Sequence, residues 1–345
     1  MAATRILAAD EPSLAVAAAL LRAGELVAFP TETVYGLGGD ALNPHAVARI
    51  FAAKGRPAED PLIIHLAAAA DLDLVTRDPP PALAMLADHF WPGPLTLVLP
   101  QQPGRAACRK RGRETVAVRV PGLPLARRLI AAAGTPIAAP SANRFGHTSP
   151  TSAAHVLADL DGRIAAVIDG GATNVGLEST VLDLTSTPPT LLRPGGVSLE
   201  QLQALLGEVA LGAKVAPGGG QIAPGLLERH YAPEHPLRLV IGPVDAARAW
   251  LRGEAEQLLA AGLRVGLLIP DEDAAFFADR TYDLELLGPA AQPELVAQRL
   301  YAALRALDAR RPDRILARDI GIAGIARAVA DRLRRAAAGD VTELG

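Results

Sequence analysis

Short apolar strands alternate with helical stretches along most of the chain, and this alternation restricts the fold more than any other feature. A strand predicted at residues 26–29 is followed by a helix at 43–53, which Asn43 caps and Gly55 ends. The same alternation continues with strands predicted at 61–65, 95–99, 115–120, 136–139, 165–168 and 180–184, and with helices at 13–21, 80–90, 124–133 and 198–206. Interleaved strands and helices predict an α/β layer fold.

A Pro- and Gly-rich stretch interrupts this pattern between residues 211 and 236. It contains the run 217–220 and the prolines Pro224, Pro233 and Pro236, and such residues end helices and strands. A chain of 345 residues is also longer than one core usually supports. We therefore predict a first domain over residues 1–210, a linker over 211–236 and a second domain over 237–345.

The second domain has a simpler pattern of strands and helices. Strands are predicted at 237–241, 265–269 and 314–316, and helices at 244–261, 293–309 and 322–337. Strands separated by helices of this length indicate a small parallel sheet covered by helices.

Composition excludes several classes of protein. The formal charge of −3 gives no global electrostatic case for nucleic-acid binding. Cys108 is the single cysteine, so the chain has no internal disulfide and fits a reducing compartment. No stretch approaches the roughly 18 apolar residues of a membrane span, and the first residues lack the apolar core of a secretion signal. We expect a cytoplasmic protein with no membrane association.

The familiar nucleotide, metalloprotease and hydrolase motifs are missing from the sequence. It has no GxxxxGK[ST], no GxGxxG after a strand, no HExxH and no GxSxG. It also has no CxxC pair or His/Cys cluster, so we predict no metal site built by the protein alone. Polar residues instead gather where predicted strands end, which is where open α/β sheets bind ligands.

The first two of these polar segments lie in the amino-terminal part of the chain. Residues 30–38 read PTETVYGLG, and their hydroxyls and glycines leave backbone amides accessible to a small polar ligand; a tight turn explains the same residues. Lys54 and Arg56 follow the second predicted helix, where both cations could bind the same polyphosphate. Alternatively, they complement the dipole at the end of that helix.

Three further segments and two single features complete the set of candidates. Residues 140–143, PSAN, place a hydroxyl and a carboxamide after a strand, or form an Asx or Ser turn, and Ser149 begins the next predicted helix. The segments 176–181 and 192–195 are polar turns, the second with Arg193.

His65 lies at the end of a predicted strand and either binds a ligand or has a structural role. The basic run 105–113 is either a solvated loop or an RNA contact.

Eight segments in this order closely resemble the threonylcarbamoyl-AMP synthase family with the YrdC-like fold. They are PTETVYGLG, KGRPAEDPLIIH, FWPGPLTLVLP, TVAVRVP, APSANRFGHTSPTSAAHV, IDGG, GLESTVLDL and LLRPGG, and the agreement extends over roughly residues 13–200. The segment RHYAP at residues 229–233 resembles the longer members, which append a small Rossmann-like domain. The resemblance implies a YrdC-like twisted mixed sheet with helices, followed by a parallel α/β domain.

The resemblance also implies two sets of site residues. The threonine pocket would be formed by Thr33, His65, Arg119, Ala139 and Ser179. ATP would be bound by Lys54, Arg56, Asp60, Thr115, Ser141, Asn143, Ser149, Arg193 and Tyr231. Lys54 and Arg56 would be the catalytic cations, and Asp60 stands where asparagine is expected.

The reaction implied by the resemblance joins L-threonine, bicarbonate or carbon dioxide, and ATP into threonylcarbamoyl-AMP and pyrophosphate, with Mg²⁺ accompanying ATP. The product would pass to a tRNA threonylcarbamoyl transferase, tRNA would contact this chain weakly, and the linker would act as a lid that brings Tyr231 over ATP. Two other functions remain open from the residues: a carbamoyl-adenylate-forming enzyme of the hydrogenase-maturation type, and a noncatalytic RNA-binding module supported by the run 105–113.

Overall fold

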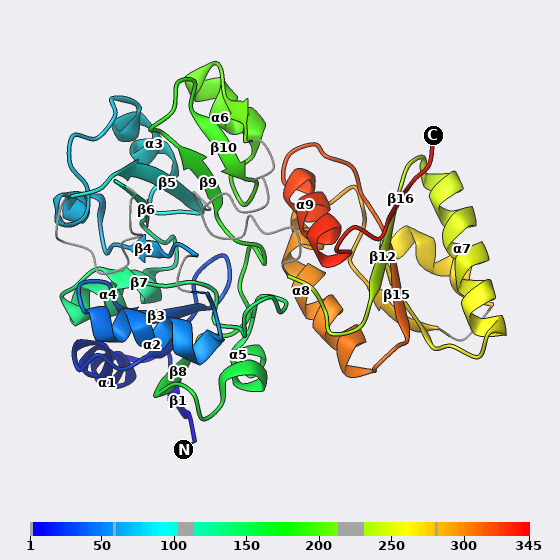
Figure 1. Cartoon of the computed structure of the whole chain (residues 1–345), viewed down its shortest axis with the longest axis horizontal. Coiled ribbons are helices and arrows are strands. Elements are labelled where there is room, and N and C mark those ends of the chain that lie inside the picture. Colours follow the sequence, from blue (N-terminus) through cyan, green and yellow to red (C-terminus); the bar gives the residue numbers. More distant parts are fainter. Residues whose placement is uncertain (1–2, 58–59, 103–113, 213–230, 280–281) are drawn as a thin grey trace. The chain divides into compact units, whose positions relative to one another are not determined.

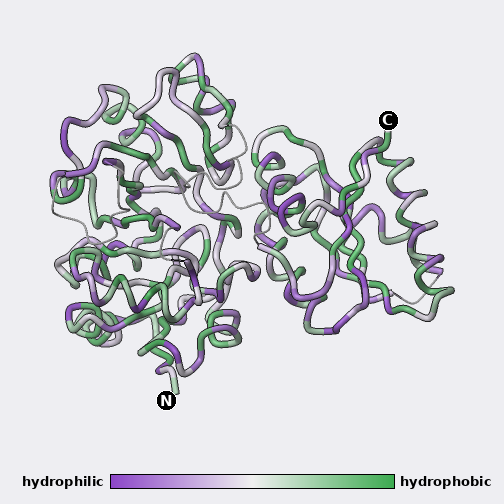
Figure 2. Tube along the Cα trace, in the orientation of Figure 1, coloured by the Kyte–Doolittle hydropathy of each residue, from purple (hydrophilic) through white to green (hydrophobic). Residues whose placement is uncertain are grey.

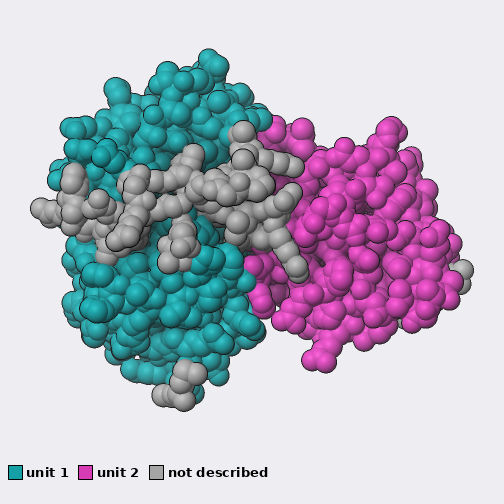
Figure 3. Space-filling model, in the orientation of Figure 1, with its two compact units in different colours: residues 1–145, 149–226 teal, residues 146–148, 227–345 magenta. Residues whose placement is uncertain are grey.

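The structure, a computed structural model, describes residues 3–57, 60–102, 114–212, 231–279 and 282–345. The chain divides into two compact units, which Figure 3 colours separately. The first contains residues 1–145 and 149–226, and the second contains residues 146–148 and 227–345. The second unit thus takes in the end of the predicted linker and a three-residue segment that the sequence assigns to the first domain.

The described residues of the first unit contain an eleven-stranded mixed sheet (Figure 1). Its strands are β1 Arg5–Ala8, β2 Val27–Phe29, β3 Gly36–Asp40, β4 Ile63–His65, β5 Leu95–Pro100, β6 Thr115–Arg119, β7 Ile137–Ala138, β8 Ala166–Asp169, β9 Thr180–Asp183, β10 Thr190–Arg193 and β11 Ala210–Leu211. They lie in the order β1-β8-β2-β3-β7-β4-β6-β5-β9-β10-β11. Parallel pairs such as β4–β6 and antiparallel pairs such as β5–β6 both occur, so the predicted mixed α/β sheet is confirmed.

The helices of the first unit begin and end largely where the local sequence predicts. They are α1 Glu11–Arg22, α2 Pro44–Lys54, α3 Ala82–Phe90, α4 Pro124–Ala133, α5 Ala153–Leu160 and α6 Leu199–Leu206, with a 3₁₀ turn, η1, at Ala69–Leu74. Asn43 caps α2 by accepting hydrogen bonds from the amides of His45 and Ala46. Gly55, with φ 64°, ends the same helix in the left-handed conformation.

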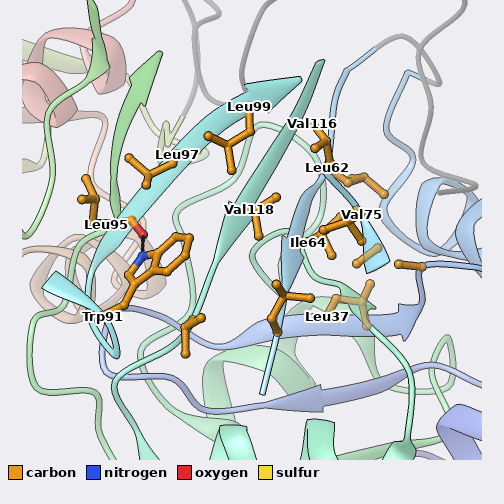
Figure 4. Packing of buried hydrophobic residues seen from close by; sticks show 14 of the residues in the cluster. Leu37, Leu62, Ile64, Val75, Trp91, Leu95, Leu97, Leu99, Val116 and Val118 are labelled. Carbon is orange, nitrogen blue, oxygen red and sulfur yellow. Dashed lines mark hydrogen bonds between the residues drawn. The ribbon is translucent and has the colours of Figure 1, made fainter. Parts of the chain in front are cut away.

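Alternate residues of β2 and of the position before it belong to two different cores, one on each face of the sheet. Leu26 and Ala28 pack in a core that includes residues of α2, α3, α5 and α6, whereas Val27 and Phe29 pack against α1 and α4. Figure 4 shows part of the first core, where the indole nitrogen of Trp91 donates to the carbonyl of Leu95 at 2.7 Å. Helices therefore cover both faces of the sheet around β2, whereas a separate small cluster lies on one face of β4, β6, β5 and β9, formed by Ile63, Ala117, Val98 and Val181.

The glycine-rich segment after β2 is a strand, not the loop that the sequence suggested. Gly36, Gly38 and Gly39 lie in β3, which pairs with β2 and β7. A Cβ on Gly38 would lie 2.7 Å from the ring of Phe29. These glycines therefore allow the neighbouring strand and its side chains to approach closely.

The helix predicted to begin at Ser149 begins later. Residues 149–152 are not helical, and α5 starts after Ser152, whose hydroxyl accepts from the amide of His155 at 3.3 Å. Ser152 has the extended backbone of an N-cap, with φ −147°. Ser149 therefore lies in a buried loop before α5 and does not cap that helix.

The described residues of the second unit contain a five-stranded sheet with the order β14-β13-β15-β12-β16. Its elements are β12 Leu237–Ile241, α7 Val244–Ala260, β13 Val265–Ile269, the 3₁₀ turn η2 Asp271–Phe277, β14 Asp283–Leu286, α8 Pro293–Ala309, β15 Arg314–Arg318, α9 Ala326–Ala336 and β16 Val341–Glu343. Each neighbouring pair is parallel, which confirms the parallel α/β prediction.

Helices flank this second sheet, with α7 on one side and α8 and α9 on the other (Figure 1). Figure 2 shows hydrophobic and hydrophilic residues alternating along α7, and Ala247, Leu251 and Ala255 form its buried face. The last helix begins at Ala326 and not near 322, because Gly321 and Gly324 adopt positive φ angles in the preceding turn. Within the described parts of the chain, no helix has the length and apolar character that crossing a bilayer requires.

Candidate functional site

A row of polar side chains crosses adjacent strands of the first sheet on one face. His65 at the end of β4 pairs in register with Arg119 at the end of β6. Two residues earlier on these strands, Ile63 and Ala117 belong to one buried cluster. Because side chains of a strand alternate between faces, His65 and Arg119 project from the same face as that cluster.

Two hydroxyls continue the row on the next strands, β5 and β9. Thr96 and Ser179 each precede by two positions a residue of the same buried cluster, Val98 and Val181. Their hydroxyl oxygens lie 2.7 Å apart. At the other end of the row, the amide of Ala139 donates to the carbonyl of Ile63 at 3.0 Å. Four predicted threonine-binding residues thus lie across the strands β7, β4, β6 and β9.

The fifth predicted residue, Thr33, reaches this row through Arg119. The guanidinium of Arg119 donates from Nη1 to the hydroxyl of Thr33 at 2.9 Å and from Nε to the carbonyl of Gly93 at 3.1 Å. Its Nη2 lies 2.5 Å from Oε1 of Glu32. Thr31 holds the turn after β2 in place through its hydroxyl, which lies 2.8 Å from that of Thr33. The structure therefore brings all five predicted threonine-binding residues together.

The charges in this row are fixed by burial and by Arg119. Burial alone raises the pKa of Glu32, but the charge of Arg119 and the backbone of Gly122 outweigh it and hold that pKa below its ordinary value. Burial, and after it the charge of Arg119, lower the pKa of His65 to about 3. At neutral pH the row thus carries an ionised Glu32 beside Arg119, and an uncharged His65.

Lys54 binds the loop that follows β7. Its ammonium donates to the main-chain carbonyls of Ser141 and Asn143 at 2.5 and 2.6 Å. The side chain is buried, and burial together with the charge of Arg56 lowers the pKa of Lys54 well below its ordinary value. Lys54 therefore fixes residues 141–143 against the end of α2, and Ser141 also forms a β-bridge with Gly36.

Arg56 forms a buried ion pair with Asp60. Nη2 of Arg56 lies 2.9 Å from Oδ2 of Asp60 and also donates to the carbonyl of Pro61 at 2.8 Å. The carboxylate at position 60, where asparagine was expected, is thus a direct partner of the second predicted cation. Any anion that binds Arg56 must share it with Asp60.

Two more predicted ATP-binding residues are joined to the row through the segment before β9. The hydroxyl of Ser149 donates to the carboxylate of Glu178 at 2.5 Å. Arg193 at the end of β10 donates from Nη2 to the carbonyl of Ser179 at 2.9 Å and to its hydroxyl at 3.3 Å. Both residues are buried. Ser149 and Arg193 therefore converge on residues 178–179.

The remaining predicted residues lie apart from these contacts. Thr115 begins β6 on the same face as Arg119, but at the opposite end of the strand. Tyr231 belongs to the second unit, where its ring lies 5.9 Å from that of Tyr301 and 4.9 Å from the guanidinium carbon of Arg332. The basic run 105–113 and most of the linker lie outside the described residues.

Three residues of the site were not predicted from the sequence: Glu32, Thr96 and Glu178. Glu32 and Glu178 lie inside segments already recognised as polar, and a carboxylate next to a hydroxyl in such a segment was the available signal. Thr96 lies within an apolar strand. Its polar side chain between Leu95 and Leu97 was the only indication in the sequence that it belongs to the site. Among the described residues, no group of three or more His, Cys, Asp or Glu could hold a metal ion.

Two family models match consecutive parts of the chain. Residues 19–195 match the Sua5, YciO and YrdC family, described as telomere recombination. Residues 197–338 match the model described as the C-terminal domain of threonylcarbamoyl-AMP synthase. Together these two models extend over most of the sequence.

Relatives of this chain match it over almost its whole length. The threonylcarbamoyl-AMP synthase of Bacillus subtilis is 45% identical over 97% of this chain and 96% of its own. That of Pyrococcus abyssi is 44% identical over 95% of this chain and 94% of its own. The crystal structure of P. abyssi Sua5 complexed with L-threonine superposes with a TM-score of 0.93 at 42% identity, covering 99% of this chain and 100% of that one.

Proposed function

The chain belongs to the threonylcarbamoyl-AMP synthase family, and on this premise we propose that it makes threonylcarbamoyl-AMP and pyrophosphate from L-threonine, bicarbonate or carbon dioxide, and ATP. The observation that carries the proposal is the row formed by Thr33, His65 and Arg119, which ends at Ala139, two residues before Ser141. An amino-acid site and a cation-bound loop thereby meet at one strand end.

Threonine fits the row by its chemistry. Arg119 offers a buried guanidinium to the substrate carboxylate, an arrangement that favours charge-assisted hydrogen bonds. The uncharged ring of His65 and the hydroxyls of Thr33 and Ser179 suit the hydroxyl of threonine, because each can donate or accept. Ala139 contributes through its main chain.

The amine of threonine first adds to carbon dioxide and loses a proton, giving a carbamate. A carbamate oxygen then attacks the α-phosphorus of ATP, the bond to the β-phosphate oxygen breaks, and pyrophosphate leaves. The protein need not form a covalent bond in this reaction. Its contribution is to orient the two substrates and to place cations near the charge that develops on the phosphoryl oxygens.

We assign ATP binding to the second set of residues that the family resemblance indicates. They are Lys54, Arg56, Asp60, Thr115, Ser141, Asn143, Ser149, Arg193 and Tyr231. Lys54 and Arg56 are the catalytic cations in this proposal. Since Lys54 already binds two carbonyls and Arg56 already binds Asp60, ATP must share these partners or displace them.

Mg²⁺ would accompany ATP and neutralise charge on the phosphate oxygens. Proteins commonly hold Mg²⁺ with one or two carboxylates together with substrate phosphates and water. Asp60 and Glu178 are carboxylates next to the proposed ATP-binding residues, so the chain offers suitable oxygen ligands without a cluster of its own.

The product is a reactive mixed anhydride, so an enzyme that transfers the threonylcarbamoyl group must consume it. We propose that the consumer is a tRNA threonylcarbamoyl transferase and that the basic run 105–113 makes at most a weak tRNA contact. The linker, in this proposal, closes over the site and shields the carbamate from water.

A pyrophosphate-release assay tests the proposal. Wild-type protein should release pyrophosphate only when threonine, bicarbonate and ATP are all present, and serine should support a slower reaction. Release with carbamoyl phosphate in place of threonine and bicarbonate would instead indicate the hydrogenase-maturation type of chemistry. No release under any of these conditions would leave only the RNA-binding alternative.

A further inference from the structure

We infer that Glu32 is a positioning residue that acts through Arg119 to set the affinity for threonine, an inference that rests on the function proposed above. Oε1 of Glu32 lies 2.5 Å from Nη2 of Arg119, and the two side chains are 12% and 4% exposed. An ion pair in so little water keeps much of its strength and direction.

Arg119 is held by three separate parts of the chain. Its Nε binds the carbonyl of Gly93, its Nη1 binds the hydroxyl of Thr33, and its Nη2 binds Glu32. A guanidinium is planar with donors in fixed directions, so three contacts fix its plane as well as its position. Of these three partners, Glu32 is the one that carries a charge.

The backbone around Glu32 is also held in place by other parts of the site. Its main-chain carbonyl accepts from the amide of Val175 at 2.8 Å, and its neighbour Thr33 is bound to the same Arg119. Both carboxylate oxygens are buried from solvent. The carboxylate of Glu32 is thus closed off from solvent beside Arg119, and its influence on a substrate passes, in this inference, through that residue.

Arg119 in turn keeps Glu32 charged. Burial raises the pKa of Glu32 by itself, but Arg119 and Gly122 hold it below its ordinary value, so Glu32 is ionised at neutral pH. The other titratable neighbour, His65, is uncharged there because its pKa is about 3. Glu32 is thus the counter-charge of Arg119 within the row.

Gly122 offers a way to move the carboxylate without removing its charge. A Cβ built on Gly122 would lie 3.1 Å from both Cδ and Oε1 of Glu32. That distance is tight enough to displace the carboxylate by a few tenths of an ångström. Its backbone does not have the positive φ that only glycine adopts readily, so alanine fits the chain itself.

The experiment compares Glu32→Gln and Gly122→Ala with wild-type protein, and uses Glu25→Gln as the matched control. Glu25 pairs with Arg49 at the surface of the same unit, so its substitution also removes a glutamate from an ion pair with arginine. KM for threonine, KM for ATP, kcat and the melting temperature are measured for each variant, and threonine binding without ATP is measured by calorimetry.

A positioning role predicts a change confined to threonine. Glu32→Gln should raise KM for threonine about tenfold and Gly122→Ala about threefold, while KM for ATP stays within about twofold of wild type. Glu25→Gln should match wild type in every measurement. If Glu32→Gln fails to fold, Gly122→Ala decides the question alone.

Two results would overturn the inference: an unchanged KM for threonine, or a rise in both KM values that follows the fall in melting temperature. The second result would indicate a purely structural ion pair. Failure of the proposed function looks different, because wild-type protein would then form no adenylate. In that case calorimetry still tests the role of Glu32. Weaker threonine binding in the variants than in wild type supports that role, and equal binding, or no binding at all, contradicts it.

Discussion

Lys54 and Arg56 are only two residues apart, yet they have different kinds of partner. Lys54 donates to main-chain carbonyls of the loop after β7, whereas Arg56 faces the carboxylate of Asp60. Loss of Lys54 would release a loop. Loss of Arg56 would leave a buried carboxylate without its cation, which is the more costly change in a low-dielectric site.

The Arg56–Asp60 pair allows stability and ATP binding to be separated. Arg56→Gln should lower the free energy of unfolding by about 3 kcal/mol, because it removes one partner of a buried ion pair. Arg56→Gln combined with Asp60→Asn should recover most of that stability, because neither charge remains. ATP affinity should stay low in both variants. Urea unfolding and ATP titration measure the two effects, and recovery of ATP affinity along with stability would show that Arg56 has a structural role only.

The lowered pKa of His65 predicts how the free energy of unfolding depends on pH. Its pKa of about 3 in the folded chain lies below its ordinary value of 6.5. Above pH 6.5 the ring is neutral in both states; as the pH falls from 6.5 toward 3, only the unfolded chain takes up the proton. The free energy of unfolding should therefore fall by up to about 1.4 kcal/mol per pH unit from this group.

The measurement compares wild-type protein with His65→Asn by urea unfolding at several pH values between 4 and 7.5. The stability advantage of wild type over the variant should shrink as the pH decreases, because asparagine does not titrate. An advantage that stays constant over this interval would show that His65 can be protonated in the folded chain.

Much of the candidate site could be predicted because its cations and hydroxyls follow predicted strands or helices. His65 and Ser141 were found in this way, whereas Arg119 was indicated by the family resemblance. His65 and Arg119 lie next to each other because the parallel strands β4 and β6 end at the same edge. Glu32 and Glu178 could not be found, since their importance depends on partners 87 and 29 positions away, at Arg119 and Ser149. Such pairings exist only once the chain has folded.

At the scale of elements, β3 is the part of the fold that depends most on glycine. Gly38→Ala should lower the free energy of unfolding by about 2 kcal/mol, because the new Cβ would lie 2.7 Å from Phe29 and 3.1 Å from Ile137. Gly253→Ala in α7 is the control, since its Cβ would meet nothing within 4 Å. That variant should gain about 0.5–1 kcal/mol from helix propensity.

Thermal unfolding of both variants, followed by circular dichroism, checks this expectation. If Gly38→Ala melts at the wild-type temperature, the close approach of β2 and β3 does not restrict which side chains β3 can accommodate. A loss of stability in Gly253→Ala would show instead that α7 has neighbours at that position.

Elements with strong local signals could be predicted, and elements without them could not. The sequence of helix α2 contains both its cap and the glycine that ends it, and β12 and β13 are mainly apolar, with Arg238 the one charged residue. Strands β1, β11, β14 and β16 were not predicted: they are short strands at the edges of the two sheets. Their pairing is decided by the neighbouring strand, which lies elsewhere in the sequence, as β8 does for β1. Strand β10, next to β11, was also missed, because the sequence indicated a polar turn at 192–195.

At the scale of the whole molecule, the two units and the two family models raise the question of what the second half contributes. A chain that ends at Gly212 would retain β11, whose pairing with β10 completes the described sheet. We predict that this shortened chain folds but forms threonylcarbamoyl-AMP at a rate lower by at least about tenfold, because it lacks the proposed lid and Tyr231. Adenylate formation at the wild-type rate would refute the lid.

The central claim is that one site in the first unit joins threonine, bicarbonate and ATP. The most direct measurement supplies ¹³C-bicarbonate, threonine and ATP, and then analyses the quenched reaction by mass spectrometry. We predict one new compound that contains the labelled carbon, threonine and AMP together, and that is absent when Arg119 is replaced by alanine. Pyrophosphate released without such a compound, or a labelled adenylate that contains no threonine, would contradict the account.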